Sequence, residues 1–289
     1  MQGELAALTA AFLWAWTATF FTVASRHIGS FAVNVYRIPL GLLLLALTYF
    51  LANGSLLVTP YQVLMLSLSG IVGLAIGDAF LFEAFVLIGP RLTMLIYTMS
   101  PAMTAVIAFL FLSERMGLMA LGGMAVIMIG ILWVLMDRNP GVRQANVRGV
   151  LYGLLGSLGQ AIGLVLAKSA LDTGIDALYA TIIRMAAATL AMGLVVLVYR
   201  NPGTLSILRD KRRAILPLVG GVICGPYLGV WLSQVAIKLT LTGIAATLMA
   251  MVPVIIIPIS AVVEKERITV RAILGALVAI AGVTLLFMR

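Results

Sequence analysis

The sequence is poor in the residues from which most catalytic and metal-binding sites are built. It holds one cysteine, Cys224, and one histidine, His27, among 289 residues. A single cysteine excludes an internal disulfide and a cysteine-based zinc cage. No glycine-rich segment runs into Lys-Ser or Lys-Thr, so no nucleotide-binding loop is predicted. Because it shows neither a nucleophile with its base nor clustered metal ligands, the sequence favours neither an enzyme nor a bound cofactor.

Charged residues are also scarce, at 10% of the chain, whereas 63% of the residues are hydrophobic. A soluble domain carries about 25% charged residues, and a chain of this size cannot hide so many apolar residues in one core. We therefore expect lipid as the solvent and a multi-pass protein of the cell (inner) membrane. The net charge of +9 does not indicate nucleic acid, because the basic residues lie in short loops between apolar runs.

Ten apolar runs have about the 20 residues that a membrane-spanning helix needs. The predicted helices are 3–24, 31–52, 61–87, 91–112, 117–136, 148–169, 175–199, 214–237, 241–263 and 269–288. A polar linker, 138–147, divides the chain into two repeats, 1–137 and 148–289, of five helices each. The first run is of full membrane length and follows no basic segment, so it is kept as a helix rather than a signal peptide.

The two halves share residues at a nearly constant shift. Arg37 pairs with Arg184 at a shift of 147, and Trp14 pairs with Gln160 at 146. From Gly77 onward the shift is 152, as for the prolines, Pro101 and Pro253. Other pairs at 152 are Gly123 with Gly275, Gly130 with Gly282, and Glu114 with Glu266. Because five is an odd number, the second half enters the membrane from the opposite side. The predicted fold is all-α with two inverted five-helix repeats, a plan that places a transporter's site near the midplane between the repeats.

Lysine and arginine are distributed unequally between the predicted loops. With the N-terminus outside, the inside loops hold Arg26, Arg91, Arg138, Arg143, Arg148, Arg200, Arg209, Lys211, Arg212, Arg213, Lys265, Arg267 and Arg271. The outside then holds only Arg115, Lys168, Lys238 and Arg289. This bias favours both termini outside.

On these residues the chain resembles the EamA-type members of the drug/metabolite transporter superfamily. The resemblance covers the whole chain and depends on the two-repeat plan, on Arg37 and Arg184, and on paired motifs. These are Ser100-Pro101 running to Ser113-Glu114-Arg115 and Val252-Pro253 running to Lys265-Glu266-Arg267. It implies a secondary transporter of small organic metabolites, often an exporter of amino acids or related compounds. Ten-helix members usually keep both termini in the cytosol, so the resemblance and the charge bias imply opposite orientations.

Glu83 is the leading candidate for coupling and substrate binding, because ionisable groups deep in a membrane helix are usually functional. Its transport role is weighed against an ion pair with Arg37 or Arg91. We expect Glu83→Gln to abolish coupled transport. Asp78 is a second coupling candidate, but it lies about 140° from Glu83 around the helix. The alternative for Asp78 is a bond to a neighbouring helix.

Arg37 and Arg184 each lie early in a predicted helix, and these two helices run in opposite directions through the membrane. The sequence favours a structural role for both arginines. Snorkelling to the interface is that role, and binding a substrate carboxylate is the alternative. The two are expected toward opposite faces, so that only one meets a substrate at a time.

The remaining candidates line a predicted cavity or a predicted gate. The candidate lining residues are Trp14, Tyr97, Gln160, Tyr227, Trp231 and Gln234. Ordinary helix packing is the alternative for the rings, whereas an amide that faced lipid would be unsatisfied. Pro101 and Pro253 are predicted in mid-helix, where proline removes a backbone hydrogen bond and bends the helix. A paired bend suits gating, and a static kink is the alternative.

Together these residues predict a secondary transporter of a small amino acid-like, polar or amphipathic metabolite, working by alternating access and driven by a proton gradient. Uniport and exchange remain open. A lipid or lipid-linked sugar translocator is the alternative function.

Overall fold

The computed structural model describes residues 1–51, 58–135, 146–198, 212–263 and 269–288. Within these ranges the chain is helical and contains no strand. The elements of the first half are α1 (Gln2–Ile28), α2 (Ser30–Leu51), α3 (Pro60–Ser69), η1 (Gly70–Gly77), α4 (Asp78–Tyr97), α5 (Ser100–Leu112) and α6 (Leu118–Leu135). Those of the second half are α7 (Val147–Leu171), α8 (Ala177–Val198), η2 (Arg212–Ala214), α10 (Ile215–Val222), η3 (Ile223–Gly229), α11 (Val230–Leu239), α12 (Thr242–Met249), α13 (Val252–Val263) and α14 (Val270–Phe287).

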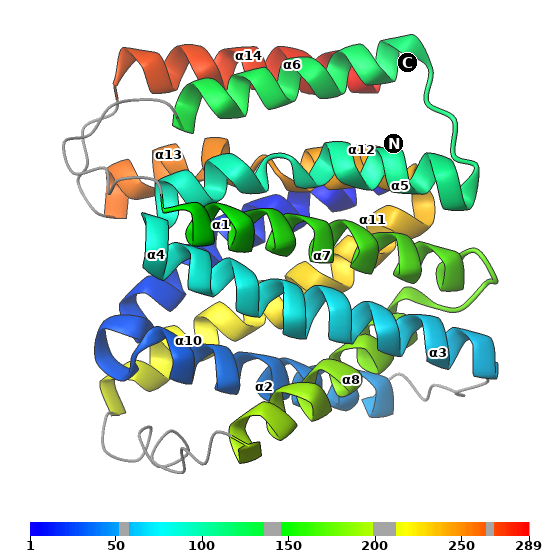
Figure 1. Cartoon of the computed structure of the whole chain (residues 1–289), viewed down its shortest axis with the longest axis vertical. Coiled ribbons are helices and arrows are strands. Elements are labelled where there is room, and N and C mark those ends of the chain that lie inside the picture. The colour runs from blue at the N-terminus through cyan, green and yellow to red at the C-terminus, as the bar shows by residue number, and fades with distance from the viewer. Residues whose placement is uncertain (52–57, 136–145, 199–211, 264–268, 289) are drawn as a thin grey trace.

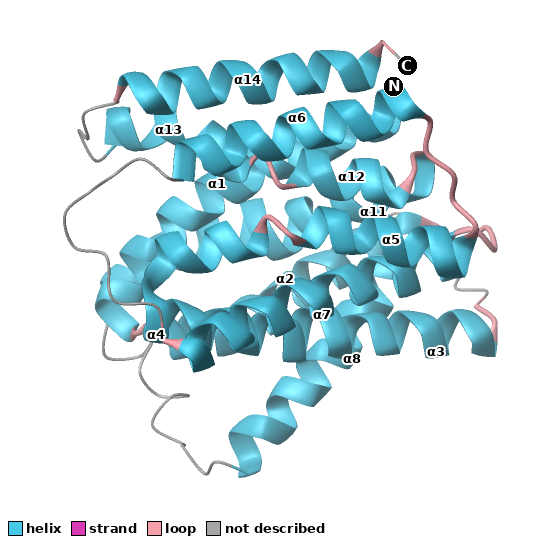
Figure 2. Cartoon of the chain, turned by 45° about the horizontal axis from the view of Figure 1, so that its top comes forward, coloured by secondary structure: helices cyan, strands magenta, loops and turns pink. Residues whose placement is uncertain are grey.

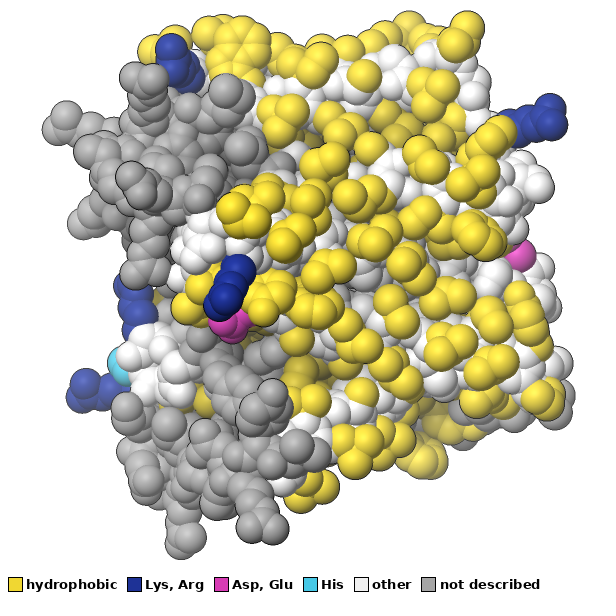
Figure 3. All heavy atoms as spheres, in the orientation of Figure 1, with side chains coloured by type: hydrophobic (Ala, Val, Ile, Leu, Met, Phe, Trp, Pro, Cys, Tyr) yellow, Lys and Arg dark blue, Asp and Glu magenta, His cyan; other side chains and the backbone are white. Residues whose placement is uncertain are grey.

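Among the described residues, eight helical segments are long and apolar enough to cross a membrane. Two further apolar helices, Ser100–Leu112 and Leu118–Val134, are shorter. Figure 3 shows one side of the molecule covered largely by hydrophobic side chains, with most of the blue and cyan basic side chains near its two ends. An apolar belt between charged ends is the surface that a bilayer requires.

Both termini lie at the same end of the helix bundle (Figures 1 and 2). We call this the terminal end. The predicted basic segments at residues 136–145, 199–211 and 264–268 lie outside the described ranges. The predicted linker 138–147 falls almost wholly among them, as do Glu266 and Arg267.

The fourth and ninth predicted helices are each broken in two, which the sequence analysis did not predict. Helix α4 continues past residues 89–90 to Tyr97, and α5 begins at Ser100 with Pro101 at the start of the helix. Likewise α12 ends at Met249 and α13 begins at Val252, immediately before Pro253. The prediction of mid-helix prolines was therefore wrong. A proline in the first turn removes no internal hydrogen bond, because the first N–H groups of a helix have no partner there.

The third helix of each half contains a π-helical segment at the same repeat position. The segments are Gly70–Gly77 and Ile223–Gly229, and their last residues differ by 152 (229 − 77). Each packs on the first helix of the other half. A Cβ added at Gly77 would lie 3.4 Å from Gln160 N, and one at Gly229 would lie 2.5 Å from Trp14 Nε1. Since Trp14 and Gln160 are themselves repeat equivalents, the same contact occurs twice with the halves exchanged.

Helices α6 and α14 show the symmetry most directly, because they cross at two reciprocal glycine contacts. A Cβ at Gly123 would lie 3.1 Å from Gly282 O, and one at Gly130 would lie 2.7 Å from Gly275 O. Gly123 and Gly275 are repeat equivalents, as are Gly130 and Gly282. The lower-numbered residue of one helix thus meets the higher-numbered residue of the other, so the helices are antiparallel and related by a local two-fold axis. An axis that exchanges antiparallel spanning helices lies across them, which is the relation of inverted repeats.

The close contact of α6 with α14 gives a first prediction. In Gly130→Ala the new Cβ would lie 2.4 Å from Ala279 N, and backbone cannot move aside as a flexible side chain does. We expect the melting temperature of the purified protein to fall, with a cost of about 1–3 kcal/mol for overpacking. Gly122→Ala on the same helix is the control, because a Cβ there meets nothing within 4 Å. Equal melting temperatures for the two variants would contradict the tight glycine contact.

Candidate functional site

An ion pair inside the bundle joins Arg37 on α2 to Asp78 at the start of α4. Arg37 Nη2 donates a hydrogen bond to Asp78 Oδ2, and Arg37 Nε donates to Asn34 Oδ1 at 2.8 Å. The Arg37 guanidinium also lies 5.3 Å from the centre of the Phe82 ring. Each side chain of the pair is only 17% exposed. Asp78 therefore makes the bond to a neighbouring helix that the sequence analysis considered for it.

Arg184 of the second half lies near the same carboxylate. Its residue is 2% exposed, and its guanidinium lies beside Gly73 of η1, where an added Cβ would be 3.7 Å from Nη2. Arg184 and Asp78 interact electrostatically. Each arginine is placed seven residues, about 10 Å, after the first residue of its helix. The expected separation of the two arginines toward opposite faces is not found, because both helices bring their arginines within electrostatic range of Asp78.

Tyr97 interacts with this charged group, and two further predicted aromatic residues pack beside α8, the helix that carries Arg184. Tyr97 is close enough to interact electrostatically with Asp78 and Arg37. The rings of Tyr227 and Trp231 lie 6.2 Å apart, and both pack against the core cluster that contains Met185, the neighbour of Arg184. The Tyr227 hydroxyl is also 2.8 Å from Thr48 Oγ1 of the first half. These contacts bring η3 and α11 against α2 and α8.

The two predicted glutamines and Trp14 have different environments. Trp14 and Gln160 lie at the equivalent crossings described above and are partly buried. Gln234 is fully buried. Its Nε2 donates to Ser233 Oγ at 3.3 Å, whereas its Oε1 has no hydrogen-bond partner among the described residues. A buried amide oxygen without a donor is costly, so Gln234 is a polar group that a ligand would satisfy.

Glu83 is separated from the charged group. Asp78 and Phe82 face Arg37, whereas Glu83 lies on the exposed face of α4 with Ala79 and Val86. Positions 78 and 83 are about 140° apart around the helix, so Glu83 must point away from the bundle when Asp78 points into it. The ion pair between Glu83 and Arg37 was therefore a wrong alternative, and the placement of Glu83 within a central site was wrong as well.

Some residues of the site were not on the sequence-based list of site candidates. Arg184 was assigned a structural role, and Phe82, Thr48 and Asn34 were overlooked. Phe82 could have been recognised from the sequence, because a residue at i+4 from Asp78 shares its helix face. Thr48 and Asn34 could not, since their roles depend on which helix lies opposite.

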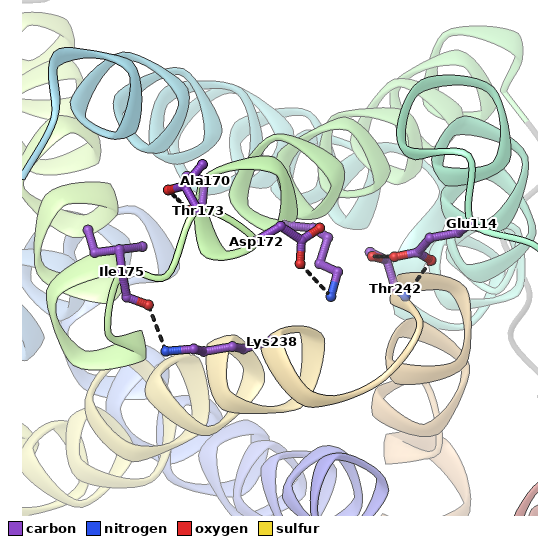
Figure 4. Close-up of polar contacts among 8 residues, drawn as sticks. Glu114, Ala170, Asp172, Thr173, Ile175, Lys238 and Thr242 are labelled. Atoms are coloured by element: carbon purple, nitrogen blue, oxygen red, sulfur yellow. Dashed lines mark hydrogen bonds and ion pairs between the residues drawn. The ribbon is translucent and has the colours of Figure 1, made fainter.

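A separate set of polar contacts ties the two halves together at the terminal end. Gln62 Nε2 donates to Thr173 Oγ1 at 2.7 Å, and Thr240 Oγ1 donates to Glu4 Oε1 at 3.0 Å. A further bond at this end, within the second half, is drawn in Figure 4, where Lys238 Nζ donates to the carbonyl of Ile175 at 2.8 Å. Among the described residues, this end is therefore held by bonds that cross between the repeats.

Glu114 belongs to this terminal set. Both of its carboxylate oxygens accept hydrogen bonds at 2.7 Å from Thr242, one from its N–H and one from its hydroxyl. Glu114 thus caps α12 of the other half, because a carboxylate is stabilised at a helix N-terminus. Its repeat partner Glu266 lies outside the described residues.

Comparison with known proteins agrees with this architecture. The family model of the EamA-like transporter family matches this chain twice, over residues 1–136 and 147–288. The chain belongs to the EamA-like transporter family. No curated protein sequence matches it significantly. A solved structure named only "Crystal structure of protein" is similar over 99% of this chain and 96% of its own, with a TM-score of 0.81. Its sequence identity of 17% limits that likeness to the fold.

Membership of the EamA-like family makes this a multi-pass membrane protein of a transporter family with a two-repeat architecture. The resemblance drawn from Arg37, Arg184 and the paired proline motifs is thereby confirmed. Members of this family are transporters rather than enzymes.

Proposed function

We propose that this EamA-like protein is a secondary transporter that moves a small organic metabolite across the cell (inner) membrane by alternating access. The supporting observation is the group formed by Arg37, Asp78 and Arg184. It brings one arginine from each half into interaction with a single carboxylate. A site shared by two inverted repeats is the arrangement that rocking of one repeat against the other can open to each side in turn.

The proposal assigns ten spans to the chain, counting α5 with the end of α4 and α12 with α13. For this proposal we follow the positive-inside bias and assign the terminal end to the outside, the opposite of the orientation that the family resemblance implies. The inter-repeat bonds of Gln62, Glu4 and Glu114 then hold the outer end closed in this conformation. The helix breaks before Pro101 and Pro253 are the paired hinges, because the two-residue turns there lack a continuous helical ladder.

The candidate substrate contacts are now Arg37, Arg184, Tyr97, Tyr227, Trp231 and Gln234. Asp78 replaces Glu83 as the candidate coupling carboxylate if protons drive transport. A lipid or lipid-linked sugar translocator remains the second function, and it has less support because the charged group is enclosed by helices of both halves rather than open to lipid.

A cross-link at the terminal end tests alternating access. In a background of Cys224→Ala, which removes the only cysteine, Gln62→Cys and Thr173→Cys would be joined by a short thiol-reactive linker that reducing agents cleave. We expect solute counterflow in proteoliposomes to stop on linking and to return on cleavage, because the outer end can no longer open. Each single-cysteine variant treated in the same way is the control. Undiminished counterflow in the linked double variant would contradict alternating access through this end.

A further inference from the structure

Among the described residues, the charge of the central group is not balanced. Arg184 is 2% exposed, and its Nε has no hydrogen-bond partner among the described residues. Asp78 is hydrogen-bonded to Arg37 instead. The two other buried carboxylates of the described chain, Glu4 and Glu114, are engaged at the terminal end. Two guanidinium groups and one carboxylate leave a net charge of about +1, and an uncompensated buried charge is strongly destabilising.

The repeat explains why the acid is missing. Arg184 is the equivalent of Arg37, so its acid is expected at the position equivalent to Asp78. That position is 78 + 152 = 230, which is Val230. Val230 follows η3 as Asp78 follows η1, and it packs against the cluster that contains Met185, next to Arg184. The second half therefore has the arginine but no acid at the position equivalent to Asp78.

We propose that the missing partner is the substrate, and that this substrate is a small organic monoanion whose carboxylate binds Arg184. The planar guanidinium presents a fork of N–H donors that matches a carboxylate. One free positive charge selects a monoanion over a phosphate monoester, which carries about −1.5 to −2. A zwitterion is disfavoured as well, because the only carboxylate of the group, Asp78, is already paired and offers no second charge for an ammonium.

The aromatic residues indicate what the carboxylate is attached to. Phe82 lies against Arg37, Tyr97 is within electrostatic range of it, and Tyr227 and Trp231 pack on the apolar cluster beside α8, so the remainder of the substrate is apolar or aromatic. Arg184 is covered in the conformation closed at the terminal end. The ligand reaches it when the covering helices move, as alternating access requires. This inference rests on the proposed transport function and adds the substrate class.

The test uses the purified protein and probes of one skeleton that differ only in charge. These are 3-phenylpropionate, its neutral amide, zwitterionic L-phenylalanine and cationic L-phenylalanine amide, with inorganic phosphate as the other anion. We expect 3-phenylpropionate to raise the melting temperature and to drive counterflow, with an apparent affinity at least about tenfold above that of its amide. Equal affinity for the amide, or tighter binding of the cation or of phosphate, would contradict the assignment of a monoanionic substrate. It would not contradict the proposed transport function. Absence of counterflow for these probes and for a broad solute panel would instead overturn the proposed function and, with it, this inference.

Variants at two positions separate a ligand contact from a structural charge. Arg184→Gln is expected to weaken 3-phenylpropionate binding at least about tenfold, with the exposed Arg115→Gln as a control that binds normally. Val230→Asp supplies the acid internally, so it is expected to abolish carboxylate binding while keeping or raising the melting temperature. Val230→Asn has the same size without the charge and is expected to bind within about threefold of the parent protein. Normal carboxylate binding by both Arg184→Gln and Val230→Asp would refute the proposal, and if Arg184→Gln does not fold, Val230→Asp decides alone.

Discussion

Replacing Asp78 with asparagine is expected to abolish transport and to lower the melting temperature. The change removes the only negative charge of the central group and leaves Arg37 and Arg184 without it in a low-dielectric environment. Breaking a buried ion pair in this way costs about 3–5 kcal/mol, somewhat reduced here because the pair is 17% exposed. Counterflow in proteoliposomes and thermal unfolding in detergent measure the two effects separately.

Glu83→Gln is the matched control for Asp78→Asn, because it also turns a carboxylate into an amide on α4. Glu83 lies on the exposed face of that helix, so we expect counterflow and melting temperature to stay near the parent values. This reverses the expectation from sequence, in which Glu83 carried the coupling. Loss of transport in Glu83→Gln together with normal transport in Asp78→Asn would restore the sequence-based assignment and remove the central group from the mechanism.

The second large effect is expected for Gly70→Ala, at the start of the π-helical segment η1. A Cβ at Gly70 would lie 2.0 Å from the backbone oxygen of Arg184. Neither backbone can yield locally, so α8 must move away from η1 and take the Arg184 guanidinium with it. We expect destabilisation by about 1–3 kcal/mol and a loss of transport larger than this destabilisation explains.

Gly193→Ala provides the comparison on α8, because an added Cβ there has no neighbour within 4 Å. Alanine is favoured over glycine within a helix by about 0.5–1 kcal/mol, so this variant is expected to transport normally and to melt at the same or a higher temperature. Normal transport by stable Gly70→Ala protein would show that the position of α8 against η1 does not control the site.

Much of the architecture could be predicted because it depends on properties that are local in sequence. The length and apolar character of the runs predict membrane helices, since unpaired backbone groups are intolerable in lipid. The constant shift of 152 predicted the equivalences that now explain the reciprocal contacts of Gly123 with Gly282 and Gly130 with Gly275. By contrast, the breaks before Pro101 and Pro253 were predicted as bends, because a proline in an apolar run is equally consistent with a kink and with a new helix start.

The composition and the internal repeat were enough to identify a two-repeat membrane protein of a transporter family, because both depend only on residue types and their spacing along the chain. Which side chains meet was decided only by the tertiary structure. Arg37, Asp78 and Arg184 are far apart in sequence. Only the packing of α2, α4 and α8 shows that Asp78 faces inward, that Glu83 faces outward and that Arg184 has no ion-pair partner among the described residues. The orientation of a polar residue around its helix depends on which helix packs against it, and that information is absent from any single segment.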